Sequence, residues 1–123
     1  LACLTSTNEL RFDFPYQGGS PATICFRQSP QYGFDAWVRI DPGQFTCLMD
    51  CTINVKFDDG AIQSFSAGGA SDGSADIIFL RNANRFLNGA KTASRIVLEA
   101  EFFQAGRHQM VFENASGLEW PHS

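Results

Sequence analysis

The sequence lacks a long apolar run, a cluster of basic residues and a complete secretory signal. No stretch approaches the roughly 20 apolar residues that cross a bilayer, so no transmembrane helix is expected. The net charge is −4, and the arginines are spread singly along the chain. This argues against a nucleic-acid partner, which needs clustered cations. The chain begins too late to contain the apolar region of a signal peptide.

Charged residues are also scarce, at 18%, whereas hydrophobic residues make up 44% of the sequence. This balance excludes disorder and is sufficient for a hydrophobic core. Phenylalanine is abundant, with 12 copies, and it brings a large apolar area without a polar atom to satisfy. A length of 123 residues fits one domain. We expect that domain over residues 10–120, after a flexible N-terminal segment over 1–9 and before a short tail over 121–123.

Apolar residues alternate with polar ones along most of the chain, which indicates strands. Strands are expected over 10–14, 22–28, 35–41, 52–58, 61–66, 76–81, 95–103 and 107–113. One helical pattern, near residues 83–92, places apolar residues three and four apart, with Asn82 as its N-cap. The prediction is a mostly β fold: an antiparallel β-sandwich or curled barrel of about eight strands with one short helix.

Two local patterns give more specific expectations. The dipeptide Asp59-Gly60 predicts a type I′ turn whose central residues both have positive φ. The unbroken apolar run 77–80 predicts a strand buried on both faces.

The four cysteines favour disulfides over a metal site. Cys47 and Cys51 are separated by three residues, a spacing that zinc sites also use. A structural zinc needs four ligands, however, and the histidines are only His108 and the near-terminal His122. A local Cys47–Cys51 disulfide is therefore favoured, with free thiols as the alternative, and no metal site is predicted.

Two interpretations of Cys3 exclude each other. The opening Leu1-Ala2-Cys3 matches the end of a lipoprotein signal, which would make Cys3 the site of a lipid anchor. Otherwise Cys3 pairs with Cys25 in a second disulfide. In the first case Cys25 is a free thiol.

No arrangement of residues predicts catalysis. His108 alternates with Met110 and Phe112, so we expect it to point toward the core near a strand end. Glu99 and Glu101 share one strand face and are typical of a solvated surface. No serine lies in a nucleophile elbow. The chain is expected not to be an enzyme, and no catalytic residue or cofactor is predicted.

Aromatic residues outside the alternating core are the candidate binding residues. They lie in loops or on an outer strand face: Tyr16, Tyr32, Phe34, Trp37 and Trp120. Such rings stack on sugars and are enriched in protein interfaces. The alternative is that they cover sheet edges or the helix.

Linked motifs along the chain resemble a family of small exported Gram-negative envelope proteins of unknown function. The motifs are FDFPYQGG (12–19), GQFTC (43–47), CTINVKFDDG (51–60), IFLRNANRF (78–86), EAEFFQ (99–104) and SGLEW (116–120). The resemblance covers most of residues 10–120, with a more distant similarity to accessory envelope proteins of type VI secretion systems. It implies an envelope β-sandwich with a local Cys47–Cys51 disulfide, and it brings no catalytic residues.

The function expected from the sequence is therefore that of a non-enzymatic bacterial envelope protein. It would be periplasmic or anchored at the outer membrane, and it would act as an interaction or accessory module for another envelope or host protein. The alternative is a β-sandwich that binds carbohydrate or peptidoglycan through Trp37, Tyr32 or Trp120.

Overall fold

The computed structural model describes residues 2–7, 10–11, 19–29, 33–40, 43–47, 50–69, 74–102 and 106–113. Within these residues lie the strands β1 (Ala2–Thr5), β2 (Leu10–Arg11), β3 (Gly19–Ser20), β4 (Ala22–Ser29), β5 (Gly33–Ile40), β6 (Asp50–Phe57), β7 (Gln63–Gly69), β8 (Ile77–Leu80), β9 (Arg95–Phe102) and β10 (Gly106–Glu113), and the helix α1 (Ala83–Ala90).

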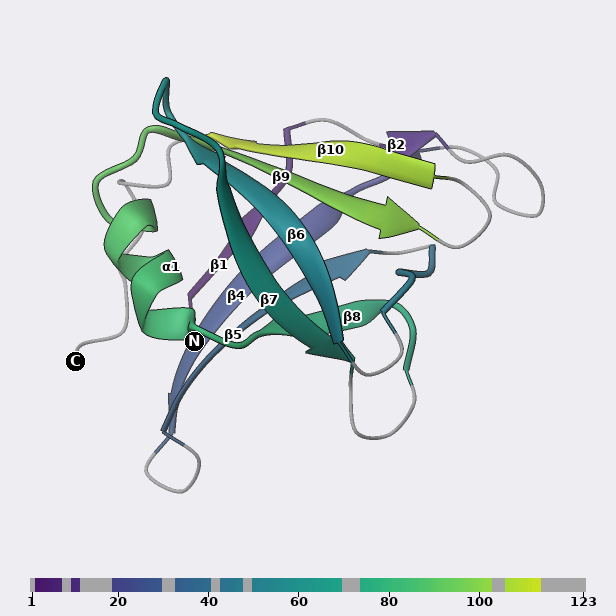
Figure 1. Cartoon of the computed structure of the whole chain (residues 1–123), viewed down its shortest axis with the longest axis horizontal. Helices are drawn as coiled ribbons and strands as arrows, with labels where there is room; N and C mark the ends of the chain where they lie inside the picture. Colours follow the sequence, from purple (N-terminus) through teal and green to yellow (C-terminus); the bar gives the residue numbers. More distant parts are fainter. Residues whose placement is uncertain are drawn as a thin grey trace.

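Eight of these strands form one antiparallel sheet that curls into a nearly closed barrel (Figure 1). The strand order is β1-β4-β5-β8-β7-β6-β9-β10, and β2 and β3 form a separate small pair. The two edges of the large sheet approach each other just after β1. There the Thr7 backbone N–H donates to the carbonyl oxygen of Val111 in β10 at 2.7 Å. The predicted mostly β fold with one short helix is confirmed.

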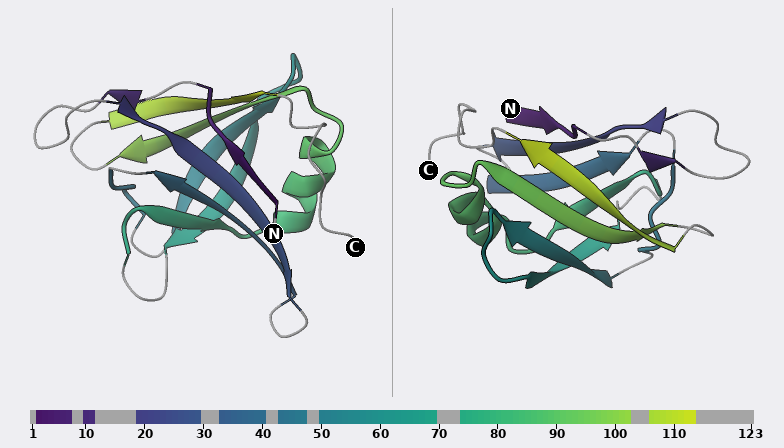
Figure 2. Two further views of the ribbon diagram at one scale, coloured as in Figure 1. Left: turned by 180° about the vertical axis from the view of Figure 1, so that it is seen from behind. Right: turned by 90° about the horizontal axis from the view of Figure 1, so that it is seen from above.

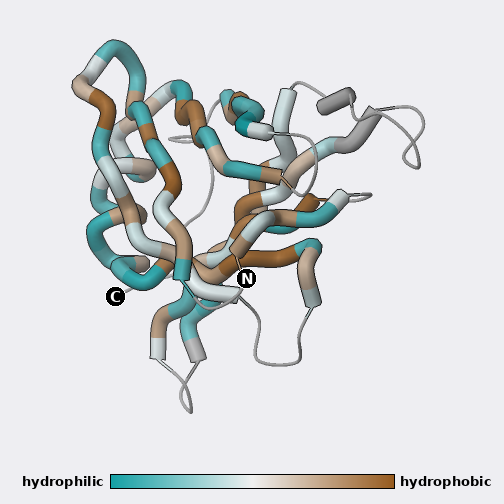
Figure 3. The backbone as a smooth tube through the Cα atoms, turned by 45° about the vertical axis from the view of Figure 1, so that its right-hand side comes forward, coloured by the Kyte–Doolittle hydropathy of each residue, from teal (hydrophilic) through white to brown (hydrophobic). Residues whose placement is uncertain are grey.

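Buried and more exposed residues alternate along most of the strands, and hydrophobic and hydrophilic residues follow one another along the tube in Figure 3. In β9, for example, Ile96, Leu98, Ala100 and Phe102 are all buried, while the residues between them are half-buried or exposed. Successive side chains of a strand point to opposite faces, so one apolar set lines the interior and a polar set faces outward.

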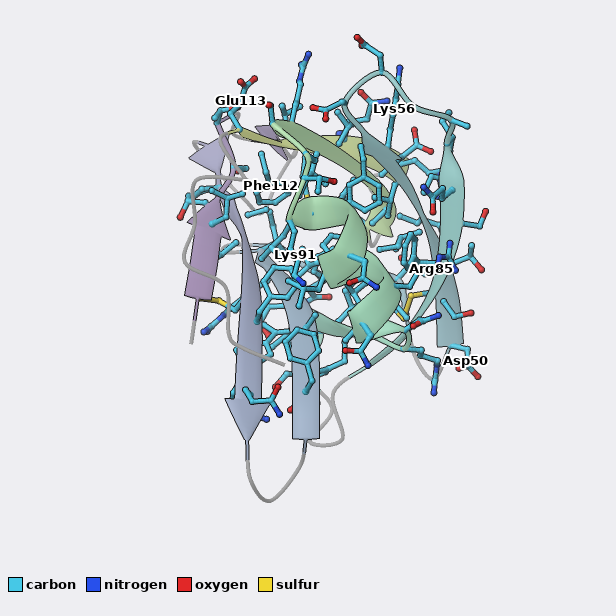
Figure 4. The ribbon with its side chains drawn as sticks, turned by 90° about the vertical axis from the view of Figure 1, so that its left-hand side faces the viewer. Asp50, Lys56, Arg85, Lys91, Phe112 and Glu113 are labelled. Carbon is cyan, nitrogen blue, oxygen red and sulfur yellow. A yellow bond between two sulfur atoms is a disulfide. The ribbon has the colours of Figure 1, made fainter. Side chains whose placement is uncertain are left out.

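The helix α1 covers one end of the barrel (Figures 1 and 4). It begins where the Asn82 side chain accepts a hydrogen bond from the Arg85 backbone N–H at 3.3 Å, as the N-cap pattern predicts. Phe86 is fully buried, and its ring centroid lies 5.8 Å from that of Phe26 and 5.6 Å from that of Phe65. A helix of eight residues is marginal alone, so this aromatic packing stabilises it.

The N-terminal region differs from the sequence expectation. Residues 2–5, which the sequence places in a flexible segment, form β1 and pair with β4 (Figure 2). In this pairing Cys3 lies opposite Cys25. The pairing partner lies about twenty residues away, so no local pattern reveals it. Of the strand expected over 10–14, Leu10–Arg11 form β2, and residues 12–14 lie outside the described ranges.

Two local expectations are corrected. In β8 only Ile78 and Leu80 are buried, whereas Ile77 and Phe79 are half-buried on the outer face. The β6–β7 turn is shifted by one residue, because the Gly60 backbone N–H donates to the Phe57 carbonyl at 3.0 Å. It is not a type I′ turn: of its central residues Asp58 and Asp59, only Asp58 has a positive φ, of 52°. Asp58 accepts this conformation because its carboxylate receives hydrogen bonds from two backbone N–H groups at the start of β9, each at 2.9 Å.

Candidate functional site

Two disulfides are present, and they occupy different parts of the barrel (Figure 4). Cys3 pairs with Cys25 across β1 and β4, with their Cα atoms 4.1 Å apart. A cysteine in a disulfide has no thiol for a lipid thioether. Of the two alternatives for Cys3, a lipid anchor or a disulfide with Cys25, the structure contains the disulfide. Cys47 pairs with Cys51 at the start of β6. Two disulfides are consistent with an exported protein.

In the described ranges, no helix has the length and apolar character that a membrane crossing requires. Nor do the described residues hold a group of three or more side chains of the His, Cys, Asp and Glu types placed to share a metal ion.

A row of side chains crosses the outer face of the sheet in one register. Cys3 lies opposite Cys25, Cys25 opposite Trp37, and Trp37 opposite Phe79. Gly68 of β7 lies opposite Phe79, and because glycine has no side chain the row ends at Phe79. Directly opposed residues point to the same face of a sheet, so these side chains form one continuous row on the outside of the barrel.

Trp37 and Phe79 form an aromatic centre within this row. Their ring centroids lie 5.9 Å apart with an interplanar angle of 51°, and both side chains are half-buried. The guanidinium carbon of Arg27 lies over the Trp37 ring, 5.3 Å from its centroid, which is within the range of a cation–π contact. One face of the indole is therefore occupied by a neighbour of the same chain.

Two ion pairs flank the aromatic centre. Arg27 binds Asp35 at 2.6 Å, and the Nε of Arg39 lies 3.2 Å from the carboxylate of Asp76. All four side chains are partly or largely exposed, so each pair stabilises the fold by only about 0–1 kcal/mol. The arrangement has an aromatic centre and a charged rim, which is the anatomy of a protein interface. We call the centre with its two ion pairs the outer aromatic strip.

Of the other aromatic residues expected to bind, the structure describes only Phe34, which lies outside this strip. Phe34 is half-buried and its ring stacks on Phe26 at 6.0 Å, so it extends the core. Tyr16, Tyr32 and Trp120 lie outside the described residues. Sequence reasoning missed Phe79, because an unbroken apolar run conceals which of its residues face outward.

A cavity of about 310 Å³ opens at the end of the barrel opposite α1. Strand β6 runs from the cavity to the helix. It begins at the cavity with Asp50 and ends at Phe57, whose ring packs against that of Phe86 in α1 at a centroid distance of 5.7 Å. The floor of the cavity is apolar and includes the buried side chains of Ile53, Ile78 and Ala100. We call this cavity the mouth.

The segment 43–47 forms one wall of the mouth and is fixed at several points. The Phe45 backbone N–H donates to the carbonyl of Ala75 at 2.7 Å, and that of Thr46 donates to the carbonyl of Glu101 at 2.9 Å. The Phe45 ring stacks on Phe102 at 4.9 Å. The disulfide from Cys47 to Cys51 of β6 completes the attachment of this wall.

Charged groups surround the rim of the mouth. Asp50, Glu101 and Arg107 line it, and Arg107 lies opposite Glu101 in the β9–β10 register. The Nε of Arg107 donates to Glu99 at 3.1 Å. This hydrogen bond, supported by one from Asn54, holds the pKa of the Glu99 carboxyl below its usual range.

His108 lies near the same end, on the core side of β10, as the alternation predicts. It is half-buried, with its ring edge-on to Phe102 at 5.8 Å. This is a packing position next to the mouth.

Comparison of the chain with protein-family models, with curated proteins and with solved structures found no match.

Proposed function

We propose that this protein is a non-enzymatic interaction module of the bacterial envelope, and that it binds another protein through the outer aromatic strip. The observation that carries the proposal is the pair of partly exposed rings, Trp37 and Phe79, between two ion pairs on the outer face of β4, β5 and β8. Aromatic side chains with a polar rim are the groups that dominate binding energy at protein interfaces.

The rigidity of this surface also supports a binding role. The strip crosses three neighbouring strands in register, and the Cys3–Cys25 disulfide fixes the strand at its edge. A preformed surface loses little conformational entropy when it binds, so more of the contact energy appears as affinity. The placement in the envelope, whether periplasmic or at the outer membrane, rests on the disulfides and on the sequence resemblance to exported Gram-negative proteins.

The alternative ligand is a carbohydrate. Sugar rings need an open aromatic face, and Arg27 covers one face of Trp37. This contact favours a protein partner over a glycan at this position.

A photo-crosslinking experiment tests the proposal in the cells that produce the protein. A photoreactive phenylalanine replaces Phe79, and in a matched control it replaces Ile62, a 69% exposed side chain in the β6–β7 connection. We expect a crosslinked protein from position 79 only, and we expect the Trp37→Ala variant to lose it. The same crosslinks from both positions, or none from position 79, would contradict the proposal.

A titration separates the glycan alternative. Peptidoglycan fragments are added to the purified protein and to its Trp37→Phe variant while tryptophan fluorescence is recorded. We expect no saturable change in either protein. A saturable change that disappears in the variant would favour the carbohydrate function.

A further inference from the structure

The mouth is separate from the outer aromatic strip and has the properties of a small-molecule site. Its volume of about 310 Å³ lies at the lower end of the range for ligand pockets, which in small barrels occur at the mouth. The opposite end is filled by α1 and its aromatic contacts, so the space is closed from below and open toward solvent.

A small side chain on the inner face of β9 leaves room for the cavity. Ala100 is 2% exposed and lies on the inner face of β9, between the larger Leu98 and Phe102. A small side chain at this position leaves room that a leucine or phenylalanine would fill. The disulfide to β6 and the backbone hydrogen bonds to Ala75 and Glu101 fix segment 43–47 in place, so this wall of the cavity is preformed.

The polar groups of the lining indicate the charge of the ligand. Two carboxylates, Asp50 and Glu101, and one guanidinium, that of Arg107, line the mouth. Arg107 donates to Glu99, while Asp50 forms an ion pair with Arg81. Of the two lining carboxylates, only Glu101 forms no ion pair with another described residue.

Thr46 and Thr52 also line the mouth, and a threonine hydroxyl can both donate and accept a hydrogen bond. The two lining carboxylates outnumber the one lining guanidinium, so the formal net charge of the lining is negative. A ligand that complements it brings hydrogen-bond donors and a positive charge, together with an apolar body that contacts Ile53, Ile78 and Ala100.

We propose that the mouth binds a small organic cation, a protonated amine carried on an apolar or aromatic body. The amine binds the Glu101 carboxylate at the rim, and the apolar body occupies the floor. The Cys47–Cys51 disulfide holds the wall of this site.

Three probes of nearly equal shape and different charge test the proposal: benzylamine, benzyl alcohol and benzoate. Each is titrated into the oxidised, isotope-labelled full chain at pH 7, and the backbone amide signals of Thr46, Thr52 and Ala100 are followed by NMR. We expect benzylamine to shift these signals saturably in the millimolar range, benzyl alcohol to bind more weakly and benzoate most weakly. Equal or tighter binding of benzoate, or no saturable shift with any probe, would overturn the proposal.

Two substitutions connect the binding to the site. Glu101→Gln keeps the size of the side chain and removes its charge. We expect it to weaken benzylamine binding about two- to fivefold, because the carboxylate is exposed and its attraction is screened. Glu113→Gln is the control, since this carboxylate lies at the other end of β10 and binds Arg95. An equal loss in both variants would contradict a specific role for Glu101.

Ala100→Leu fills the floor and should abolish binding of all three probes. If this variant does not fold, as judged by its circular dichroism and its unfolding transition, Ala100→Val makes a smaller change with the same expected direction. Unchanged benzylamine binding in a folded floor-filled variant would overturn the assignment to the mouth.

Discussion

Gly89→Ala is expected to destabilise the protein, because it places a methyl group where the Phe57 ring already lies. A Cβ atom built on Gly89 would lie 2.5 Å from Cζ and 2.8 Å from Cδ2 of that ring. Non-bonded carbon atoms prefer about 3.5–4.0 Å, so either the helix or the ring must move. The ring has little freedom, because its edge-on neighbours Phe86 and Phe65 lie at centroid distances of 5.7 and 6.5 Å.

Two opposing effects set the magnitude. Alanine is favoured over glycine within a helix by about 0.5–1 kcal/mol, and the introduced methyl group overpacks the core at a cost of about 1–3 kcal/mol. The cost exceeds the gain, so we expect a net loss of about 0.5–2 kcal/mol in the free energy of unfolding. For a chain of this size each kcal/mol lowers Tm by roughly 3–5 °C.

The assay is urea unfolding followed by circular dichroism, with both disulfides intact. Asn88→Ala is the matched control, because this neighbouring side chain is exposed, and its change should stay within about 0.5 kcal/mol. In a Phe57→Leu background the ring is absent, so Gly89→Ala should cost less there than in the wild type. A Gly89→Ala variant as stable as the wild type, or an unchanged cost in the Phe57→Leu background, would refute the steric argument.

Three further predictions concern the turn, the disulfides and the response to acid. Asp58→Ala should lower the free energy of unfolding by about 1–3 kcal/mol. Asp58→Asn should lower it by less, because asparagine tolerates positive φ and keeps an acceptor for the two N–H groups at the start of β9. Equal losses for the two variants in urea titrations would contradict this. Replacing the Cys3–Cys25 pair by alanines should cost about 3 kcal/mol, against about 2 kcal/mol for Cys47–Cys51, because the first closes a loop with a sequence separation of 22 and the second one of 4; a reversed order in thermal unfolding would rule out the loop-entropy account. The folded-state pKa of Glu99 is lowered, so its stabilising contribution is present above the ordinary glutamate pKa of about 4.3 and is lost as the pH falls through the lower folded value. When the pH is lowered from about 5 to about 3, the wild type should therefore lose more stability than the Glu99→Gln variant. Parallel curves of Tm against pH for the two proteins would argue against this contribution.

The sequence alone determined the elements whose signals are local. The period of two along 52–57 and 95–102 identifies β6 and β9 and the faces they bury, because successive side chains of a strand alternate between its faces. The helix was predictable for the same kind of reason: its apolar residues recur at a helical spacing, and Asn82 precedes them as a cap. The Cys47–Cys51 disulfide was favoured over a zinc site because the sequence has too few other ligands for a structural zinc.

The tertiary structure decided which faces remain open to solvent. The pairing of β1 with β4 and the exposure of Phe79 depend on strands that are distant in the sequence, and a hydrophobic pattern does not specify its partner. The mouth arises in the same way, from the small Ala100 facing a wall that comes from residues 43–47. Local propensity determines which face of a strand is apolar, but only the packing of non-adjacent elements determines whether that face is filled, covered or left as a site.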